Sequence, residues 1–275
     1  MTEAPPGSDG RLAAVLRDCG SAVIAVSGGV DSMSLSSFAH RTLGSDRIRM
    51  VHAVSPAVPT AATDRVRRQA IHEGWSLRLV DAGEFADERY RANPVDRCFF
   101  CKSNLYSALS RLSDGLVLSG TNTDDLGDYR PGLAAAEELG VRHPFVEAGF
   151  AKSDVRALAR RLGLPDLAAL PASPCLSSRV ETGIRIEADT LQLIDDIETW
   201  LRDRLEPETV RCRLRPQGFF VELDAATLQA LGSEGRVRLI RGARSRFPEL
   251  AGRAFAVEAY RRGSAFVGDK QVVNG

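Results

Sequence analysis

The sequence predicts an α/β fold: a parallel sheet with helices on both faces, plus a small C-terminal α+β domain. Short apolar runs alternate with helix-compatible segments from residue 21 to residue 162, which is typical of βαβ units. A proline-rich, irregular segment at 163–183 interrupts this alternation. The order afterwards is helix, two strands, helix and strand, so we expect two domains, residues 1–184 and 185–275.

Three apolar runs predict the first strands, at residues 21–26, 47–54 and 76–80. The first run, SAVIAV, is rich in β-branched side chains and leads through the hexapeptide SGGVDS into helix-compatible sequence that stops at Gly44. Residues 60–73 predict a helix between the second and third strands. Parallel neighbours need such crossover helices.

The alternation continues after the third strand. We expect a helix at 102–112, a strand at 115–119, and helices at 132–139 and 153–162. Parallel sheets are buried under helices on both faces. The first domain is therefore predicted to be a wound α/β layer structure.

The remaining sequence predicts the second domain. Its expected elements are a helix at 187–205, strands at 209–215 and 218–223, a helix at 225–231 and a strand at 255–259. Pro216 and Gln217 separate the two adjacent strands and predict a hairpin. This mixture of helices and a hairpin indicates an α+β arrangement.

Composition narrows the function classes. The 36 Lys and Arg residues balance 36 Asp and Glu residues, giving a formal net charge of zero, which disfavours nucleic-acid and membrane-surface partners. No apolar run approaches the roughly 18 residues that a spanning helix needs. The N-terminal segment lacks the basic start and apolar core of a signal peptide. We expect a soluble, cytoplasmic protein.

The five cysteines are Cys19, Cys98, Cys101, Cys175 and Cys212. Their small, odd number disfavours a disulfide framework, and in a reducing compartment they serve as core residues, metal ligands or reactive thiols. Only the Cys98-x-x-Cys101 pair has informative spacing. Cys19 ends the first helical stretch of the sequence, Cys212 lies in the expected strand 209–215, and both are expected to be buried.

The hexapeptide SGGVDS lies where a strand is expected to lead into a helix. Its members are Ser27, Gly28, Gly29, Val30, Asp31 and Ser32. Backbone N–H groups at such a helix start form a nest that binds phosphate oxygens, with the two serine hydroxyls as further donors. Asp31 can orient a phosphate-bound Mg²⁺ ion. The pattern is neither GxGxxG nor the Walker motif, although any tight strand-to-helix turn can contain two glycines.

The complete hexapeptide resembles the PP-loop of the ATP pyrophosphatase superfamily. Three further segments are similar to the LarE family of sulfur-insertion enzymes: NPVDRCFFCK at 93–102, GTNTDD at 120–125 with DYRPG at 128–132, and PCLSSR at 174–179. The similarity extends from about residue 12 into the second domain.

This resemblance implies that ATP is cleaved between its α- and β-phosphates to adenylate a carboxylate. The implied substrate is pyridinium-3,5-biscarboxylic acid mononucleotide, which gains a thiocarboxylate for nickel-pincer cofactor synthesis from a sulfide or other sulfur donor. It also implies a PP-loop α/β domain followed by a small α+β domain, and assembly into homo-oligomers.

Cys98 and Cys101 can chelate a soft metal together, but with Cys175 they are one thiolate short of a closed zinc site. A [4Fe–4S] cluster held by three cysteines leaves one iron open for an extra sulfide. The resemblance to three-cysteine LarE proteins implies this cluster. Two alternatives remain: Cys175 gives up its own sulfur, as in single-cysteine relatives, or zinc is held with a fourth ligand such as His143.

The resemblance also implies the binding residues. Arg211, Arg213 and Glu222 are expected to line the substrate pocket, and alternate strand positions place the two arginines on one face; a solvated basic strand is the plain alternative. Arg179 is expected to contact phosphate or to orient the Cys175 thiolate.

Loops at the carboxyl ends of strands bind ligands in α/β sheets. The candidate nucleotide contacts at such loops are Ser55, Gly120, Asn122 and Asp125.

Two other functions remain open at this point. A PP-loop tRNA thiolase also uses a CxxC pair and a third cysteine, but the neutral charge and the lack of a basic cluster disfavour it. A nucleotide-binding regulator with structural zinc would not need the complete SGGVDS set.

Overall fold

The structure is a computed structural model that describes residues 7–112, 115–127, 131–171 and 174–261. It divides into two compact units. The first unit comprises Met1–Asp87 and Asp96–Ser173, and the second comprises Glu88–Val95 and Pro174–Gly275. A short segment from the middle of the chain therefore belongs to the second unit.

The first unit is built on the predicted parallel sheet. Its strands are β1 (Ala22–Ala25), β2 (Ile48–Ala53), β3 (Leu77–Val80) and β4 (Leu116–Leu118), in the order β3-β2-β1-β4. Ala22 pairs with Ile48 on one side and with Leu116 on the other. The chain thus winds from β1 to β3 in one direction and returns to the opposite side of β1 for β4. Ligands bind at such a reversal of strand order.

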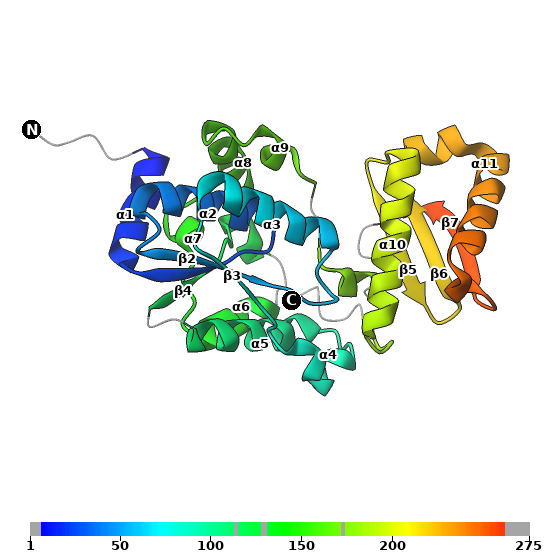
Figure 1. The fold of residues 1–275 in the computed structure, drawn as a ribbon, viewed down its shortest axis with the longest axis horizontal. Helices are drawn as coiled ribbons and strands as arrows, with labels where there is room; N and C mark the ends of the chain where they lie inside the picture. The colour runs from blue at the N-terminus through cyan, green and yellow to red at the C-terminus, as the bar shows by residue number, and fades with distance from the viewer. Residues whose placement is uncertain (1–6, 113–114, 128–130, 172–173, 262–275) are drawn as a thin grey trace, which may run out of the picture. The chain divides into compact units, whose positions relative to one another are not determined.

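Both faces of this sheet are covered by helices, as predicted (Figure 1). Ile24 belongs to the larger core cluster, with residues of α2 (Val30–Leu43), α3 (Thr60–Glu73) and α8 (Lys152–Arg161). Its neighbour Val23 belongs to a second cluster, with residues of α5 (Arg97–Arg111) and α6 (Pro131–Glu138). Alternate strand positions point to opposite faces. A fully buried Leu or Ile side chain contributes roughly 1.5–3 kcal/mol, so the two clusters hold the sheet between its helices.

The helices of the first unit include two short ones, Pro144–Glu147 and Pro165–Ala169, that the sequence did not predict. The helices are α1 (Ser8–Cys19), α2 (Val30–Leu43), α3 (Thr60–Glu73), α5 (Arg97–Arg111), α6 (Pro131–Glu138), α7 (Pro144–Glu147), α8 (Lys152–Arg161) and α9 (Pro165–Ala169). The segment expected to be irregular contains α9 in this unit and a 3-10 turn, η3 (Leu176–Arg179), in the second unit.

Helix α5 begins at Arg97, earlier than the expected residue 102. Cys98 and Cys101 therefore lie on the helix and not before it. Cys and Phe are among the weaker helix formers, so the CFFC sequence hides the helix start. Packing of the apolar face outweighs local propensity in such helices.

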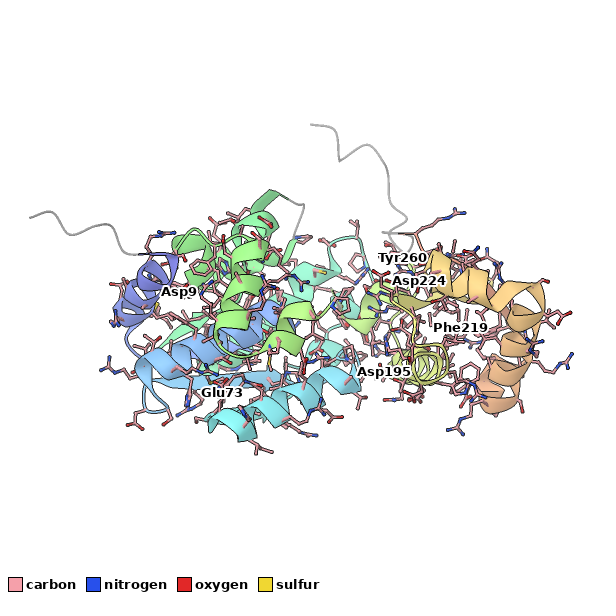
Figure 2. The ribbon with its side chains drawn as sticks, turned by 90° about the horizontal axis from the view of Figure 1, so that it is seen from above. Asp9, Glu73, Asp195, Phe219, Asp224 and Tyr260 are labelled. Carbon is pink, nitrogen blue, oxygen red and sulfur yellow. The ribbon has the colours of Figure 1, made fainter. Side chains whose placement is uncertain are left out.

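The second unit contains α4 (Glu88–Arg91), α10 (Ala188–Leu205), β5 (Val210–Arg215), β6 (Gly218–Leu223), α11 (Ala225–Arg246) and β7 (Ala254–Ala259). β5 and β6 form the expected antiparallel hairpin, and β7 pairs parallel to β6. Phe219 on β6 is fully buried (Figure 2). The expected α+β arrangement is present in this unit.

Helix α11 is much longer than the predicted segment 225–231. Gly232 interrupts it with φ 58° and ψ −171°, and the chain then resumes a helix to Arg246. A glycine after a helical run signals a helix end, so the sequence prediction stopped at the kink. Asp224, labelled in Figure 2, caps the start of α11 by accepting a 2.9 Å hydrogen bond from Thr227 N.

Across the residues that the structure describes, no helix is both long and apolar enough to cross a membrane.

Candidate active site

The SGGVDS loop connects β1 to α2 in the first unit. Gly29 caps the helix and Val30, which is buried, begins it. Gly28 has a φ of +81°, and a Cβ atom there would lie 2.8 Å from Ala62 O. Only glycine adopts this conformation readily. The short distance to Ala62 O also shows that the loop packs closely against the first turn of α3.

The two loop serines bond within the loop. Ser32 Oγ accepts a 3.0 Å hydrogen bond from Ser27 N and donates to Gly29 O at 3.3 Å. The Oγ atoms of Ser27 and Ser32 are 3.1 Å apart. Because these bonds fix the loop before any ligand binds, the helix N–H groups are preorganised for an anion.

The loop after β4 lies against the SGGVDS loop. A Cβ atom on Gly120 would be 2.7 Å from Ser32 N and 2.9 Å from Asp31 C. Both contacts are with backbone, which cannot move aside as a flexible side chain can. Gly120 therefore allows the two loops to meet at the reversal of strand order.

Asp31 is held by two side chains from distant segments. Asn122 Nδ2 donates to Asp31 Oδ1 at 3.2 Å, and Lys152 Nζ lies 2.5 Å from Asp31 Oδ2. Sequence analysis predicted Asp31 and Asn122 but missed Lys152. Carboxylate oxygens are ligands that Mg²⁺ prefers, so Asp31 has the donor chemistry that the expected ion requires, while its two oxygens are bonded here to Asn122 and Lys152.

The segment after Gly120 is stabilised by its own side chains. Asn122 N donates to Asp125 Oδ2 at 3.1 Å, and Asp124 N donates to Asn122 Oδ1 at the same distance. Lys152 N donates to Asp124 Oδ2 at 3.1 Å. The start of α8 is thereby tied to this turn, which explains how Lys152 reaches Asp31. The family-like residues 128–130 lie outside the described residues.

His52 and Ser55 follow the second strand. His52 is buried, with Nδ1 2.7 Å from Val26 O and Nε2 2.9 Å from Thr63 Oγ1. Burial lowers the pKa of His52, so the neutral ring joins the end of β1 to α3. Ser55 Oγ accepts a 3.2 Å hydrogen bond from Ala57 N and thus shapes the loop at the carboxyl end of β2.

Arg65 is a second residue that sequence analysis missed. Its Nη1 atom donates to Gly28 O at 2.8 Å. It comes from α3, and no local sequence pattern connects it with the glycine loop. The loop is therefore contacted by cationic side chains from two helices, Arg65 on α3 and Lys152 on α8.

The three expected sulfur residues lie in two different units. Cys98 and Cys101 are half-buried on one turn of α5, and Cys175 is exposed in the second unit. Among the described residues, no group of three or more His, Cys, Asp or Glu side chains is assembled as a metal site. Their thiolates have the soft donor chemistry of an iron–sulfur ligand, and the ligation itself remains a prediction.

Cys175 precedes the turn η3, which two buried arginines hold in place. Arg179 Nη1 donates to Pro174 O at 2.7 Å and to Cys175 O at 3.2 Å. Arg213 Nη1 donates to Ser178 O at 2.7 Å. The carbonyl groups on both sides of the turn are thus fixed, while Cys175 itself stays exposed.

Arg179 is paired with Glu198 of α10, which sequence analysis also missed. Nε and Nη2 of Arg179 lie 2.9 and 3.0 Å from the two carboxylate oxygens, and both residues are 0% exposed. Burial alone would lower the pKa of Arg179, but the Glu198 charge outweighs it and the pKa is raised. The guanidinium is therefore directed to Glu198 and to the main chain.

The predicted substrate residues lie on one face of the β5–β6 hairpin. Arg211 pairs in register with Glu222, and Arg213 Nε donates to Glu222 Oε2 at 3.1 Å. Arg215 Nη2 donates to Glu222 Oε1 at 3.0 Å. Glu222 is 0% exposed, while Arg211 is half-buried. Burial lowers the pKa of Arg211, with the Arg179 charge adding to this effect.

The remaining residues considered in the sequence analysis are Cys19, Cys212 and His143. Cys19 and Cys212 are buried, and burial raises the pKa of both thiols. Cys212 N donates to Glu198 Oε1 at 2.9 Å. His143 Nδ1 lies 2.7 Å from Ser119 Oγ, and burial lowers the pKa of the ring.

No family model matches the chain, but individual proteins do. The chain is 40% identical over 212 residues to an uncharacterized protein of Synechocystis, which is 76% of this chain and 78% of that protein. It is 33% identical over 221 residues to the pyridinium-3,5-bisthiocarboxylic acid mononucleotide synthase of Lactiplantibacillus plantarum, covering 79% of each. One component of the glutamine-hydrolyzing GMP synthase of Thermoplasma acidophilum is 28% identical over 222 residues, 74% of this chain and 70% of that protein.

The relationship to the Lactiplantibacillus synthase extends over most of both chains, and the likeness to GMP synthase agrees with the parallel sheet and its SGGVDS loop. The expected family and fold class are confirmed. The chain belongs to the LarE family of PP-loop ATP pyrophosphatases and is an ATP-dependent, adenylating sulfurtransferase.

Proposed function

We propose that this enzyme inserts sulfur into pyridinium-3,5-biscarboxylic acid mononucleotide, converting a carboxylate to a thiocarboxylate for nickel-pincer cofactor synthesis. The preorganised SGGVDS loop carries the proposal, because it combines an anion-binding helix start with Asp31 at its edge. The name of the Lactiplantibacillus relative supports the choice of substrate.

The first proposed step activates the substrate. A substrate carboxylate oxygen attacks the α-phosphorus of ATP, the bond from that phosphorus to the bridging oxygen breaks, and pyrophosphate leaves with the bond's electron pair. The loop N–H groups and the hydroxyls of Ser27 and Ser32 bind phosphate oxygens. Asp31 would hold Mg²⁺, which would offset the phosphate charge. Ser55, Gly120, Asn122 and Asp125 contact the rest of the nucleotide.

The second proposed step transfers sulfur. A sulfur nucleophile attacks the adenylated carbonyl carbon, and AMP leaves with the bonding electrons. We propose that Cys98, Cys101 and Cys175 would hold a [4Fe–4S] cluster, which when bound would supply sulfide at its open iron. The rival source is the thiol of Cys175 itself, and the two differ in whether the enzyme survives turnover unchanged.

The substrate phosphate is proposed to bind at the arginine face of the β5–β6 hairpin. Arg211 is half-buried and its fork suits phosphate. Arg213 and Glu222 are bonded to each other at 3.1 Å and set the neighbouring surface. Arg179 is directed to Glu198 and to the carbonyl group of Cys175, which supports the orienting role among the two expected for it.

Pyrophosphate release tests the activation step. The full-length enzyme is incubated with Mg²⁺ and ATP, and with the pyridinium mononucleotide, unmodified tRNA or neither. We expect release only with the pyridinium substrate. Release with tRNA alone would instead identify a tRNA thiolase, and no release under any condition would point to a nucleotide-binding regulator.

Iron and sulfide analysis tests the sulfur source. We expect anaerobically purified protein to absorb near 400 nm and to contain iron and acid-labile sulfide, and the Cys98→Ala variant to lose both. Iron-free protein after reconstitution would contradict the cluster. Mass spectrometry after one turnover would then show whether Cys175 had lost its sulfur.

Homo-oligomer formation is a further part of the proposal and rests on the family resemblance. Light scattering on the purified chain measures its mass in solution. A multiple of 29.8 kDa is expected. A mass equal to a single chain across the concentrations at which the enzyme is active would contradict it.

A further inference from the structure

Arg65 lies on the side of α3 that faces the SGGVDS loop. Ala62, one turn earlier on the same helix, approaches Gly28 so closely that a Cβ atom there would be 2.8 Å from Ala62 O. Residues three apart lie on the same helix face, and Arg65 Nη1 donates to Gly28 O at 2.8 Å. The guanidinium is therefore fixed at the edge of the anion-binding loop.

The charge of Arg65 has no counter-charge within the described part of the chain. Gly28 O is its one hydrogen-bond acceptor there, although a guanidinium carries five N–H groups. Arg41 and Arg142 of the same unit each pair with carboxylates at 2.9 Å or less. Burial, with repulsion from Arg68, lowers the pKa of Arg65. A part-buried cation without a partner gains from a bound anion.

We propose that Arg65 binds the β- and γ-phosphoryl oxygens of ATP and the pyrophosphate that they become. This inference rests on the proposed activation of the substrate at the same loop. Cleavage of the bond between the α-phosphorus and the bridging oxygen leaves the electron pair, and thus the new negative charge, on pyrophosphate. A fixed cation there stabilises the leaving group as its charge grows.

The planar fork of arginine makes the phosphate contact specific. The N–H groups not used by Gly28 O can form two parallel bonds to phosphate oxygens, which a lysine ammonium cannot. The contact to Gly28 O also keeps the fork oriented before ATP binds. Arg65 thus joins Lys152 as a cation at the loop, and unlike Lys152 it lacks a carboxylate partner among the described residues.

Calorimetric titration with inorganic pyrophosphate and, separately, with AMP tests the proposal. The proteins are the full-length wild type and the variants Arg65→Ala, Arg65→Lys and Arg68→Ala, all with Mg²⁺. Loss of a charged, bidentate contact is expected to weaken pyrophosphate binding by about 10- to 100-fold in Arg65→Ala. Arg65→Lys is expected to fall between it and wild type, and AMP affinity is expected to stay unchanged.

Arg68→Ala is the matched control, because Arg68 is exposed on the same helix one turn later. It is expected to bind pyrophosphate within about twofold of wild type. Equal losses of AMP and pyrophosphate affinity in Arg65→Ala, or an unchanged pyrophosphate affinity, would overturn the role of Arg65. If the wild type itself binds neither probe, the proposed function fails as well, so the two failures are distinguishable. Melting temperatures report whether each variant is folded.

Discussion

Charged residues surround both the SGGVDS loop of the first unit, called the phosphate loop below, and the turn η3 that follows Cys175 in the second unit, but their charges are arranged in opposite ways. At the loop, Asp31 and Lys152 remain partly exposed and Arg65 has no carboxylate partner among the described residues. At the turn, Arg179 and Glu198 are buried and neutralise each other. The first arrangement is suited to receiving a charged ligand, and the second to holding a backbone in place.

The largest effect is expected from Glu198→Gln. This change leaves Arg179 buried without its counter-charge, which costs about 3–5 kcal/mol of folding stability. Urea denaturation measures the loss. Glu234→Gln is the control, because Glu234 forms an exposed pair with Arg238 at 3.4 Å and its removal is expected to cost under about 1 kcal/mol. Equal losses in the two variants would remove the contrast between buried and exposed charge.

The same pair predicts a pH dependence. Burial alone would raise the pKa of Glu198, but Arg179 outweighs it and the pKa is lowered below the ordinary 4.5. A carboxyl group with a lowered pKa contributes its stability above the unfolded pKa and loses it as the pH falls through the folded value. The stability difference between wild type and Glu198→Gln is therefore expected to be constant at neutral pH and to shrink only in acid. A constant difference down to acid unfolding would contradict this.

The next effect concerns the meeting of the two loops of the first unit. In Gly120→Ala the new Cβ atom would meet Ser32 N at 2.7 Å, so the phosphate loop must shift. Substrate-dependent pyrophosphate release is expected to fall by about 100-fold, the effect of a displacement near 1 Å. Gly127→Ala, with nothing within 4 Å of its new Cβ, is the control and is expected to be near wild type. Similar activity of both variants would show that the close approach is unimportant.

A smaller effect is expected at Lys152. Lys152→Met removes the ion pair with Asp31 but keeps the hydrogen bond from Asn122. The kcat/KM for ATP is expected to fall about tenfold, or roughly 1.4 kcal/mol. Lys152→Arg keeps the charge and is expected to recover part of the loss. Steady-state kinetics at varied ATP gives kcat and KM separately. Full activity of the methionine variant would show that the ion pair is incidental to the site.

The smallest effect is expected at His52. Burial lowers the pKa of this ring from 6.5, so the unfolded chain binds the proton more readily than the folded one. Stability from the neutral ring is complete above the unfolded pKa and is lost as the pH falls through the folded value. Urea midpoints between about pH 5 and pH 8 should therefore fall more steeply on acidification in wild type than in His52→Gln. Parallel profiles would contradict the assignment.

Sequence reasoning located the phosphate loop because its residues are contiguous and follow an apolar strand. It could not locate Lys152 or Arg65, because their contacts with the loop span 121 and 37 residues and come from separate helices. Glu198 was invisible for a similar reason: a glutamate in an amphipathic helix is normally exposed. Long-range partners of this kind require the fold itself.

The predicted helix boundaries were wrong where local helix propensity and tertiary packing disagree. The start of α5 was placed too late because Cys and Phe are weak helix formers, although Tyr106 and Leu109 of this helix are packed against the sheet. The end of α11 was placed too early because Gly232 has the sequence signature of a helix end. Both errors concern local signals that tertiary contacts override.

The eight-residue stretch 88–95 bears on how the protein can be divided into fragments. Tyr90 OH lies 2.5 Å from Ser177 Oγ, and Asn93 Nδ2 donates to the carbonyl groups of Glu181 and Ile184 at 2.9 Å. A truncation after Ser173 would leave the buried side chains of Tyr90 and Asn93 without these hydrogen-bond partners. A fragment that begins at residue 174 would lack Tyr90 and Asn93 themselves. A cut between residues 173 and 174 therefore does not separate the two units, because the second unit also needs residues 88–95.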